Sequence, residues 1–477
     1  MGVARRSAWL GAAQAVEIAL QVVLPVLLVR HLAVDAFANY RLVWLIANTA
    51  ATVLPFAVPN VLSLLLPPAT AVDRRAHVAL TLVFVGCCGL LGGALTAAGL
   101  LLGLPHAGLE GVALLCAFFV SLWVAGTALD QLPVADERGD WQAKATIGLA
   151  VFRAAAAAGV ALVWQELAPL LWAMCAAAGT RVVVLLYYAQ SRHQISRAVI
   201  TQTHWVRQLR MAAPLGVAAL LFGLRRQGDL WIAATLFSVL QFAAFSLGTV
   251  LSPVVFMIRR AISATLLPTM ARQHGKGDWA SVMEMNHRAN TAVACIAVPV
   301  LSFVWCFGEP LYAMVYTEAF PQAVPVMRVL ALGWLVQVVE FNSLIMLAGQ
   351  MSYVARINGF LLVLSLLVAV AGGMILGLTG VALGSVIAIL IERTLVVRRL
   401  SQTLSIPAPA VQPWGLLLRI SALGAALGIA GRIVFELFGP SASPLLMLLI
   451  APVLLLVYVW VVGRRGWWPR KLTDSAD

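Results

Sequence analysis

Long apolar runs, separated by short polar connections, follow one another along almost the whole chain. A membrane-spanning helix needs about 20 apolar residues, and fourteen runs reach about that length. They cover about 9–29, 41–66, 77–103, 111–131, 146–165, 168–189, 212–234, 245–270, 290–308, 327–349, 357–377, 380–397, 415–437 and 443–463. No connection is long enough to fold as a soluble domain. The pattern predicts an all-α polytopic membrane protein with about 14 transmembrane helices.

The composition excludes a water-soluble fold. Hydrophobic residues make up 62% of the chain and charged residues 11%, whereas a soluble domain carries about 25% charged residues. The formal net charge is +13, but the basic residues lie in short clusters between apolar runs. No basic face interleaved with aromatic residues is present, so a nucleic-acid partner is not expected. The solvent of this chain is lipid.

The placement of Lys and Arg predicts the orientation. If the N-terminus is cytoplasmic, most of the 32 basic residues fall in cytoplasmic connections, and only Arg30, Arg41 and Arg328 fall in outer ones. This asymmetry places both termini in the cytoplasm. The first run contains Glu17 and has no small-residue cleavage site, so we expect a retained span and not a signal peptide. The predicted location is the inner membrane of a bacterium.

A weak internal repeat divides the chain. Residues 32–42 and 237–247 share Val, Phe, Ala and Leu at an offset of 205 residues, and each segment links the first two runs of a six-run block. Blocks with an even number of spans must be parallel copies, related by an axis along the membrane normal. We therefore expect two six-helix lobes around a central cavity, over residues 1–200 and 201–400. Residues 401–477 add two helices and a cytoplasmic tail.

Several short segments together resemble a known family. In chain order they are Leu32 through Tyr40, Asp229 at the end of the seventh run, Leu266-Leu267-Pro268, Tyr316 through Leu332, and Gly377 through Gly384. Their order and spacing, over about residues 8–400, resemble the Wzx-type bacterial polysaccharide flippases. These belong to the multidrug/oligosaccharidyl-lipid/polysaccharide exporter superfamily. The chain departs from the family pattern at Ala33 and Ala38, where the outer loop usually has glycines.

The resemblance implies a function and partners. It implies export of an undecaprenyl-diphosphate-linked oligosaccharide, by alternating access, from the cytoplasmic to the periplasmic leaflet. Such a flippase serves O-antigen or exopolysaccharide synthesis without a cofactor. Membrane lipids, a polysaccharide polymerase and chain-length machinery are the implied partners. A lipid II flippase and a cation-coupled multidrug antiporter have the same fold and stay open as alternatives.

Arginines within the runs are the candidate diphosphate-binding residues. A charge at mid-membrane costs about 2.5–3.5 kcal/mol on insertion scales, so such a side chain normally faces a cavity or a partner. The planar guanidinium fits phosphate oxygens, and the abundance of arginine over acid favours an anionic substrate. The candidates are Arg153, Arg181, Arg225, Arg226, Arg259 and Arg260. Arg181, near the middle of the sixth run, is the strongest of them.

Each of the other candidates also has a structural interpretation. Arg225 and Asp229 stand at i,i+4 and could neutralise each other. Arg153, Arg259 and Arg260 could reach the cytoplasmic interface with their long side chains. Arg432 lies beside Glu436 and is interpreted as an interfacial anchor.

Three acids within the runs are candidates for ion coupling or charge pairing. Glu17 and Glu340 are isolated in apolar surroundings, which fits either a proton carrier or a partner for a cavity arginine, and Asp229 is the third. Pro59 and Asn60 could break the second run or only kink it.

Enzyme chemistry and a metal site are not predicted. The six cysteines lie in apolar runs without CxxC or His-paired spacing, so they favour neither a metal nor a disulfide framework. No paired carboxylates, Ser/His/Asp set or glycine-rich phosphate loop occurs in a connection. An oligosaccharide polymerase or ligase would also need a sizeable periplasmic loop, and none is predicted. The sequence indicates a transporter.

Overall fold

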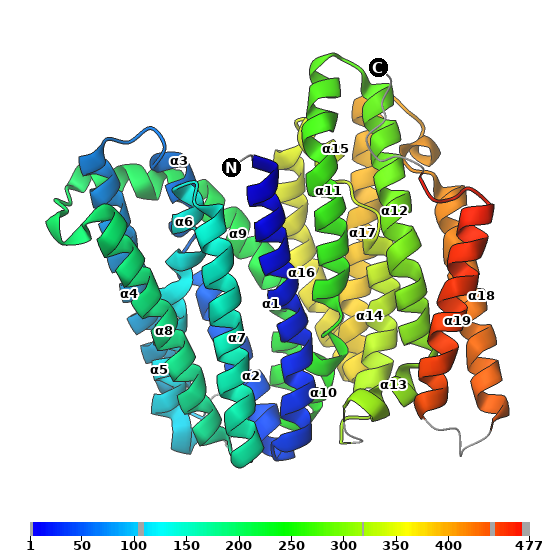
Figure 1. The fold of residues 1–477 in the computed structure, drawn as a ribbon, viewed down its shortest axis with the longest axis horizontal. Coiled ribbons are helices and arrows are strands. Elements are labelled where there is room, and N and C mark those ends of the chain that lie inside the picture. The colour runs from blue at the N-terminus through cyan, green and yellow to red at the C-terminus, as the bar shows by residue number, and fades with distance from the viewer. Residues whose placement is uncertain (1–2, 104–108, 317–318, 439–443, 470–477) are drawn as a thin grey trace. The chain divides into compact units, whose positions relative to one another are not determined.

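The computed structural model describes residues 3–103, 109–316, 319–438 and 444–469. The side chains of residues 3–10, 260, 261, 264, 265, 444 and 445 also lie outside the description. Within the described ranges every regular element is a helix (Figure 1). The predicted all-α fold class is confirmed.

Eleven of the described helices are long and apolar enough to cross a membrane. Three of the fourteen predicted runs are not among them, each for a local reason. The helix α2 (Val34–Val53) stops in the middle of its run, α14 (Ala323–Gln337) ends before a break, and α9 (Gln202–Leu236) carries Arg225, Arg226 and Asp229. The chain is a multi-pass membrane protein, and the total of fourteen spans stays a prediction.

The chain folds into two compact units, Met1–Ala243 and Ala244–Asp477. In the N-terminal unit α1 (Val3–His31) packs on α7 (Gly139–Val163), and α4 (Ala71–Leu101) packs on α5 (Ala113–Ala125). The helix α8 (Leu167–His193) contacts both α5 and α7, while α2 contacts α5 and α9. The predicted domain limits at residues 200 and 400 stay predictions.

Glycines permit the close contact between α4 and α5. A Cβ on Gly89 would lie 2.5 Å from the backbone oxygen of Ser121, and a Cβ on Gly93 would lie 2.7 Å from that of Ala117. Small residues at helix contacts are how membrane helices gain dispersion energy, because lipid supplies little hydrophobic force between them.

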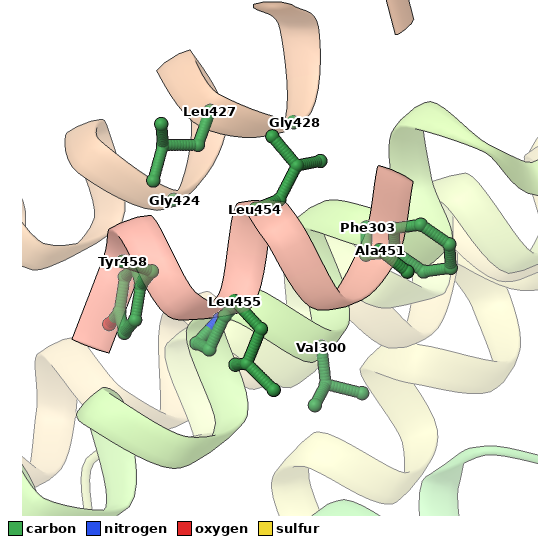
Figure 2. Close-up of a pocket in the computed structure, with 10 residues that line it drawn as sticks. Val300, Phe303, Gly424, Leu427, Gly428, Ala451, Leu454, Leu455 and Tyr458 are labelled. Carbon is green, nitrogen blue, oxygen red and sulfur yellow. The ribbon is translucent and has the colours of Figure 1, made fainter. Parts of the chain in front are cut away.

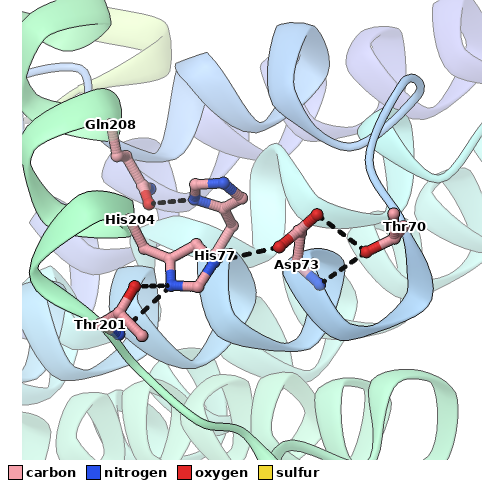
Figure 3. A network of polar contacts seen from close by, with 6 residues as sticks. All are labelled: Thr70, Asp73, His77, Thr201, His204 and Gln208. Atoms are coloured by element: carbon pink, nitrogen blue, oxygen red, sulfur yellow. Dashed lines mark hydrogen bonds and ion pairs between the residues drawn. The ribbon is translucent and has the colours of Figure 1, made fainter.

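A polar network joins the first turns of α4 and α9 (Figure 3). His204 Nε2 donates to Asp73 Oδ1 at 3.2 Å, and His77 Nδ1 donates to Gln208 Oε1 at 3.1 Å. Gln208 Nε2 in turn donates to Thr81 Oγ1 at 2.7 Å. Since His77, Thr81 and Gln208 are buried, these bonds satisfy polar groups that would otherwise destabilise the contact. They attach α9 to the N-terminal unit.

The C-terminal unit is built around α12 (Trp279–Cys306). α12 packs on α11 (Ser252–Gly275) and α18 (Trp414–Leu437), and α18 packs on α19 (Pro444–Arg464). In the same unit α17 (Leu378–Leu404) packs on α14 and on α16 (Met351–Leu376), where Gly372 and Gly380 face each other so closely that a Cβ on either would overlap the other's backbone. The shorter helices are α10 (Val239–Gly248), which spans the division between the units, α13 (Gly308–Val315) and α15 (Asn342–Leu347).

The segments of the proposed repeat occupy corresponding places in the order of elements. His31 and Leu236 each end a helix, and Val34 and Val239 each begin the next one. Both pairs are offset by the 205 residues of the sequence match. The duplication itself stays a prediction.

Candidate functional site

Two interrupted helices of the N-terminal unit line one cavity of about 320 Å³. α2 contributes Asn48, Ala51 and Thr52, and the interruption after it contributes Pro55, Ala57, Pro59 and Asn60. The second interruption, after α5, contributes Thr127, Asp130 and Gln131; the remaining lining residues are Trp123, Arg181 and Ala219. Interrupted helices within a membrane are tolerated where they line a cavity, and transporters use them to hold substrates.

The first interruption contains two consecutive residues in the left-handed region. Phe56 has φ 46° and Ala57 has φ 56°, a conformation that costs energy for residues other than glycine. Pro55 and Pro59 flank them, and a proline cannot donate a backbone hydrogen bond. The Cys88 thiol donates to the carbonyl of Leu54 at 3.2 Å, which partly satisfies the interrupted backbone. The run therefore breaks here and does not merely kink, one of the two outcomes expected at Pro59 and Asn60.

The second interruption is a 3₁₀ turn. α5 ends at Ala125, the turn η3 covers Gly126–Asp130, and α6 (Leu132–Ala135) follows with Pro133 in its first turn. A 3₁₀ segment inside a longer helical run has weaker hydrogen bonds and often marks a functional hinge. This turn brings Asp130 to the cavity.

Arg181 crosses the second interruption and pairs with Asp130. Its Nη2 donates to Asp130 Oδ2 at 2.6 Å, and the two side chains are 12% and 56% exposed. The guanidinium carbon lies 4.8 Å from the centre of the Trp123 ring. The stem of Arg181 passes over Gly126, where a Cβ would lie 3.1 Å from its Cδ. A larger residue at this position would require the stem of Arg181 to shift by a few tenths of an ångström.

Arg153 on α7 shares the same aromatic support. Its guanidinium carbon lies 5.4 Å from the centre of the Trp44 ring and 5.5 Å from that of Trp123, and the two indoles are 4.9 Å apart. Cation–π contacts of this kind hold a guanidinium away from water without using its N–H donors. The charges that act on Arg153 include Glu17, Arg181 and Asp130. The structure thus brings together the predicted Arg153, Arg181 and Glu17.

Uncharged polar side chains tie α9 to α2 beside the cavity. Gln227 accepts a hydrogen bond from Thr49 and donates to Thr52 Oγ1 at 3.3 Å. Trp231 Nε1 donates to Thr49 Oγ1 at 2.8 Å. The close approach of α9 depends on Gly223, where a Cβ would lie 2.2 Å from Thr52 Cγ2.

The other predicted residues lie elsewhere. Arg225, Arg226 and Asp229 are on α9 outside the lining of the cavity, and the guanidinium carbon of Arg226 lies 5.9 Å from the centre of the Phe222 ring. The side chain of Arg260 lies outside the described residues. Arg432 Nε lies 2.7 Å from Glu436 Oε1, and its role as an interfacial anchor stays a prediction.

Arg259 and Glu340 belong to the C-terminal unit. Arg259 Nη1 donates to the carbonyl of Gln337 at 3.1 Å, and its electrostatic neighbours include Arg393, Glu340 and Glu392. Glu340 is 5% exposed and its Oε1 accepts the backbone N–H of Ser343 at 3.2 Å. Glu340 therefore lies at the interruption between α14 and α15, where it accepts a hydrogen bond from the first turn of α15.

A second cavity, of about 190 Å³, lies between α12, α18 and α19 (Figure 2). Its walls are apolar except for Tyr458, whose hydroxyl has no hydrogen-bond partner within the described part of the chain. This cavity offers no charge to an ionic ligand. In the described residues no group of three or more His, Cys, Asp or Glu side chains could hold a metal ion.

Sequence reasoning missed Asp130, Trp44, Trp123 and Gly126. Asp130 had a usable signal, because it is an acid within the predicted run 111–131. The two tryptophans and the glycine had none, since their importance comes from the arginines that contact them across helices.

Comparison with known proteins agrees with this architecture. The profile of a family described as "Polysaccharide biosynthesis protein" matches residues 136–325. No curated protein matches the chain by sequence.

Several solved structures share the fold. The lipid II flippase MurJ, in an inward closed conformation, superposes with a TM-score of 0.71 at 10% identity, over 96% of this chain and 99% of that one. A multidrug resistance MATE family transporter of the MOP superfamily, in an inward-facing conformation, gives 0.62 at 13% identity over 81% and 96%. The Vibrio cholerae MATE transporter VcmN gives 0.55 at 15% identity over 84% and 96%. Part of the chain therefore resembles that polysaccharide biosynthesis family by sequence, and the chain shares its fold with these transporters.

Proposed function

We propose that this protein moves a polyprenyl-diphosphate-linked oligosaccharide from the cytoplasmic to the periplasmic leaflet of the bacterial inner membrane. The transported glycan serves surface or exopolysaccharide synthesis. One observation carries the proposal: two guanidinium groups, Arg153 and Arg181, lie against the shared Trp123 ring, and Arg181 lines a cavity between two interrupted helices.

The chemistry of the cavity suits such a headgroup. A diphosphate needs compensating donors wherever water is absent, and arginine offers a planar fork of donors for phosphate oxygens. Trp123 and Trp44 leave the N–H groups available because they contact the guanidinium groups through their ring faces. The amides of Asn48, Asn60 and Gln131 line the same cavity and are suited to sugar hydroxyls.

The interruptions suit alternating access. Access to a site changes when short segments next to it move, and residues that absorb large φ/ψ changes lie at the ends of elements. Phe56 and Ala57 already hold an uncommon backbone conformation beside the cavity. We infer that this segment and the turn Gly126–Asp130 rearrange during transport.

Two alternatives stay in view. Lipid II also carries a polyprenyl diphosphate, and the similarity to MurJ favours it as the second candidate. A cation-coupled drug antiporter would use an acid of the cavity to hold its cation, whereas the carboxylate of Asp130 is already paired with Arg181.

The decisive experiment is performed in a strain that lacks the protein. We expect undecaprenyl-diphosphate-linked oligosaccharide to accumulate in the inner leaflet and surface polysaccharide to be lost. The wild-type protein should restore export and Arg181→Ala should not. The matched control is Arg288→Ala, which removes an arginine from an exposed ion pair on α12 and should restore export. Accumulation of lipid II would favour the second candidate, and normal glycans with altered drug sensitivity would refute the flippase.

A further inference from the structure

Asp130 occupies the position on Arg181 that a phosphate oxygen would take. The contact of 2.6 Å between Asp130 Oδ2 and Arg181 Nη2 is a charge-assisted hydrogen bond. Within the described residues Asp130 makes no other side-chain hydrogen bond and Arg181 has no other acceptor. A phosphate can therefore bind Arg181 Nη2 only if the carboxylate of Asp130 moves away.

The surroundings allow that movement. The side chain of Asp130 is 56% exposed, whereas that of Arg181 is 12% exposed. Asp130 is the last residue of a 3₁₀ turn, whose hydrogen bonds are weaker than those of an α-helix. Arg181 is held by contact with Trp123 and Gly126. The carboxylate is thus the mobile partner and the guanidinium the fixed one.

The pair acts on Arg153 as well, but other groups act on Arg153 more strongly. The electrostatic neighbours of Arg153 begin with Glu17 and Tyr40, both from other elements, so Arg153 does not depend on Asp130 alone. Removal of Asp130 therefore changes mainly the charge balance at Arg181.

We propose that Asp130 is an exchangeable counter-ion: it holds Arg181 when the cavity is empty and is displaced when a diphosphate binds. This inference rests on the proposed function, since it requires a diphosphate substrate. The exchange lowers the affinity for the diphosphate and thereby speeds its release, because the returning carboxylate replaces the departing phosphate. Asp130 is a positioning residue that keeps binding reversible.

The test measures binding and turnover separately. Binding of farnesyl diphosphate to the full chain in detergent gives Kd, and movement of undecaprenyl-diphosphate-N-acetylglucosamine in vesicles of phosphatidylethanolamine and phosphatidylglycerol gives turnover. Asp130→Asn should lower Kd about fivefold, the size of a partly exposed ion pair, and should slow turnover. Asp130→Glu keeps the charge and should keep the wild-type values.

Two further variants separate the inference from the proposed function. In the Arg181→Ala background, Asp130→Asn should not tighten binding, because the two changes act through one contact. Glu309→Gln removes a similar acid, 52% exposed and 2.6 Å from Arg328, and should leave Kd unchanged. Diphosphate binding that needs Arg181 but is unchanged or weakened in Asp130→Asn would overturn the counter-ion. No diphosphate binding, or equal binding by Arg181→Ala, would overturn the proposed function instead.

Discussion

Two regions of the molecule, the cavity of the N-terminal unit and the interruption between α14 and α15, accommodate polar groups in different ways. In the N-terminal unit Arg181 faces a cavity and has one hydrogen-bond acceptor among the described residues, the exposed carboxylate of Asp130. In the C-terminal unit four polar residues, Asn286, Asn290, Glu340 and Gln412, are between 0% and 5% exposed. Arg181 keeps hydrogen-bond donors that a ligand could use. The four residues of the C-terminal unit are hydrogen-bonded to one another and to the backbone, and we call this arrangement the closed network.

The closed arrangement is a network that satisfies an interrupted backbone. Asn290 Nδ2 donates to Gln412 Oε1 at 2.9 Å, and Gln412 Nε2 donates to Asn286 Oδ1 at 2.6 Å. Asn290 Oδ1 accepts the backbone N–H of Glu340 at 2.8 Å, while Asn286 Nδ2 donates to the carbonyl of that residue at 3.2 Å. The network thus satisfies the backbone between α14 and α15.

The comparison teaches that a polar residue within a predicted span does not by itself identify a ligand site. Buried polar networks stabilise a fold when every member is satisfied. A ligand needs donors that the protein has left available. Arg181 meets this condition and the amides of the C-terminal network do not.

The largest expected effect lies in the closed network. Asn290→Leu should leave Gln412 Oε1 and the backbone N–H of Glu340 without the hydrogen bonds that Asn290 makes to them, at a cost of about 3 kcal/mol in the free energy of unfolding. The measurement is thermal unfolding in detergent, where a clear fall in Tm is expected. Folded protein should bind farnesyl diphosphate with the wild-type Kd. An unchanged Tm would show that the network is dispensable for stability. The proposed difference between a stabilising network and a ligand-binding Arg181 would then be wrong.

The opposite result is expected for Arg181→Ala. Loss of a charge-assisted contact should weaken farnesyl diphosphate binding by about 2 kcal/mol, roughly 30-fold, with little change in Tm. Titration calorimetry and thermal unfolding on the same preparation check both values. A variant that loses stability and keeps its affinity would assign Arg181 to the fold.

A smaller effect should follow from a change to the shared aromatic ring. Trp123→Leu removes the face against which both guanidinium groups lie and should weaken binding by about 1 kcal/mol, near fivefold. Trp123→Phe keeps an aromatic face and should recover part of the loss. Equal affinities for the Leu and Phe variants would show that Trp123 only fills space.

The smallest effect concerns an exposed pair of the C-terminal unit. Burial alone would raise the pKa of Glu309, but hydrogen bonding and charge from Arg328 hold that pKa below its ordinary value. A lowered folded-state pKa contributes stability above the unfolded-state value, and this is lost as pH falls through the folded-state pKa. Because Glu309 is 52% exposed, Glu309→Gln should cost at most about 0.5 kcal/mol at pH 7.

Stability of the wild type and Glu309→Gln, measured between pH 7 and about pH 3, checks this sign. The difference should shrink as the pH falls through the acidic range of a glutamate. A stability difference between the two proteins that grows at low pH would contradict a lowered pKa of Glu309.

Much of the fold could be predicted from the sequence because the membrane restricts the choices. Backbone groups in lipid must be satisfied within a segment, so an apolar run of sufficient length such as 168–189 becomes a helix, here α8. Interruptions were harder to predict. Pro59 suggested one, but Gly126–Asp130 lies in a run whose composition is that of an ordinary span.

The sequence by itself determined the membrane environment, the helical class, the family resemblance and the presence of arginines that needed partners. The resemblance rests on short motifs in chain order, and the other three follow from hydropathy and from the cost of burying charge, which depend on residue type and local order. Only the tertiary structure decided which arginines share a cavity. Trp44, Trp123, Gly126 and Asp130 come from α2, α5 and the turn that follows α5, and they meet Arg153 and Arg181 only when α2, α5, α7 and α8 pack together. Contacts between distant segments depend on that packing, and no local pattern records it.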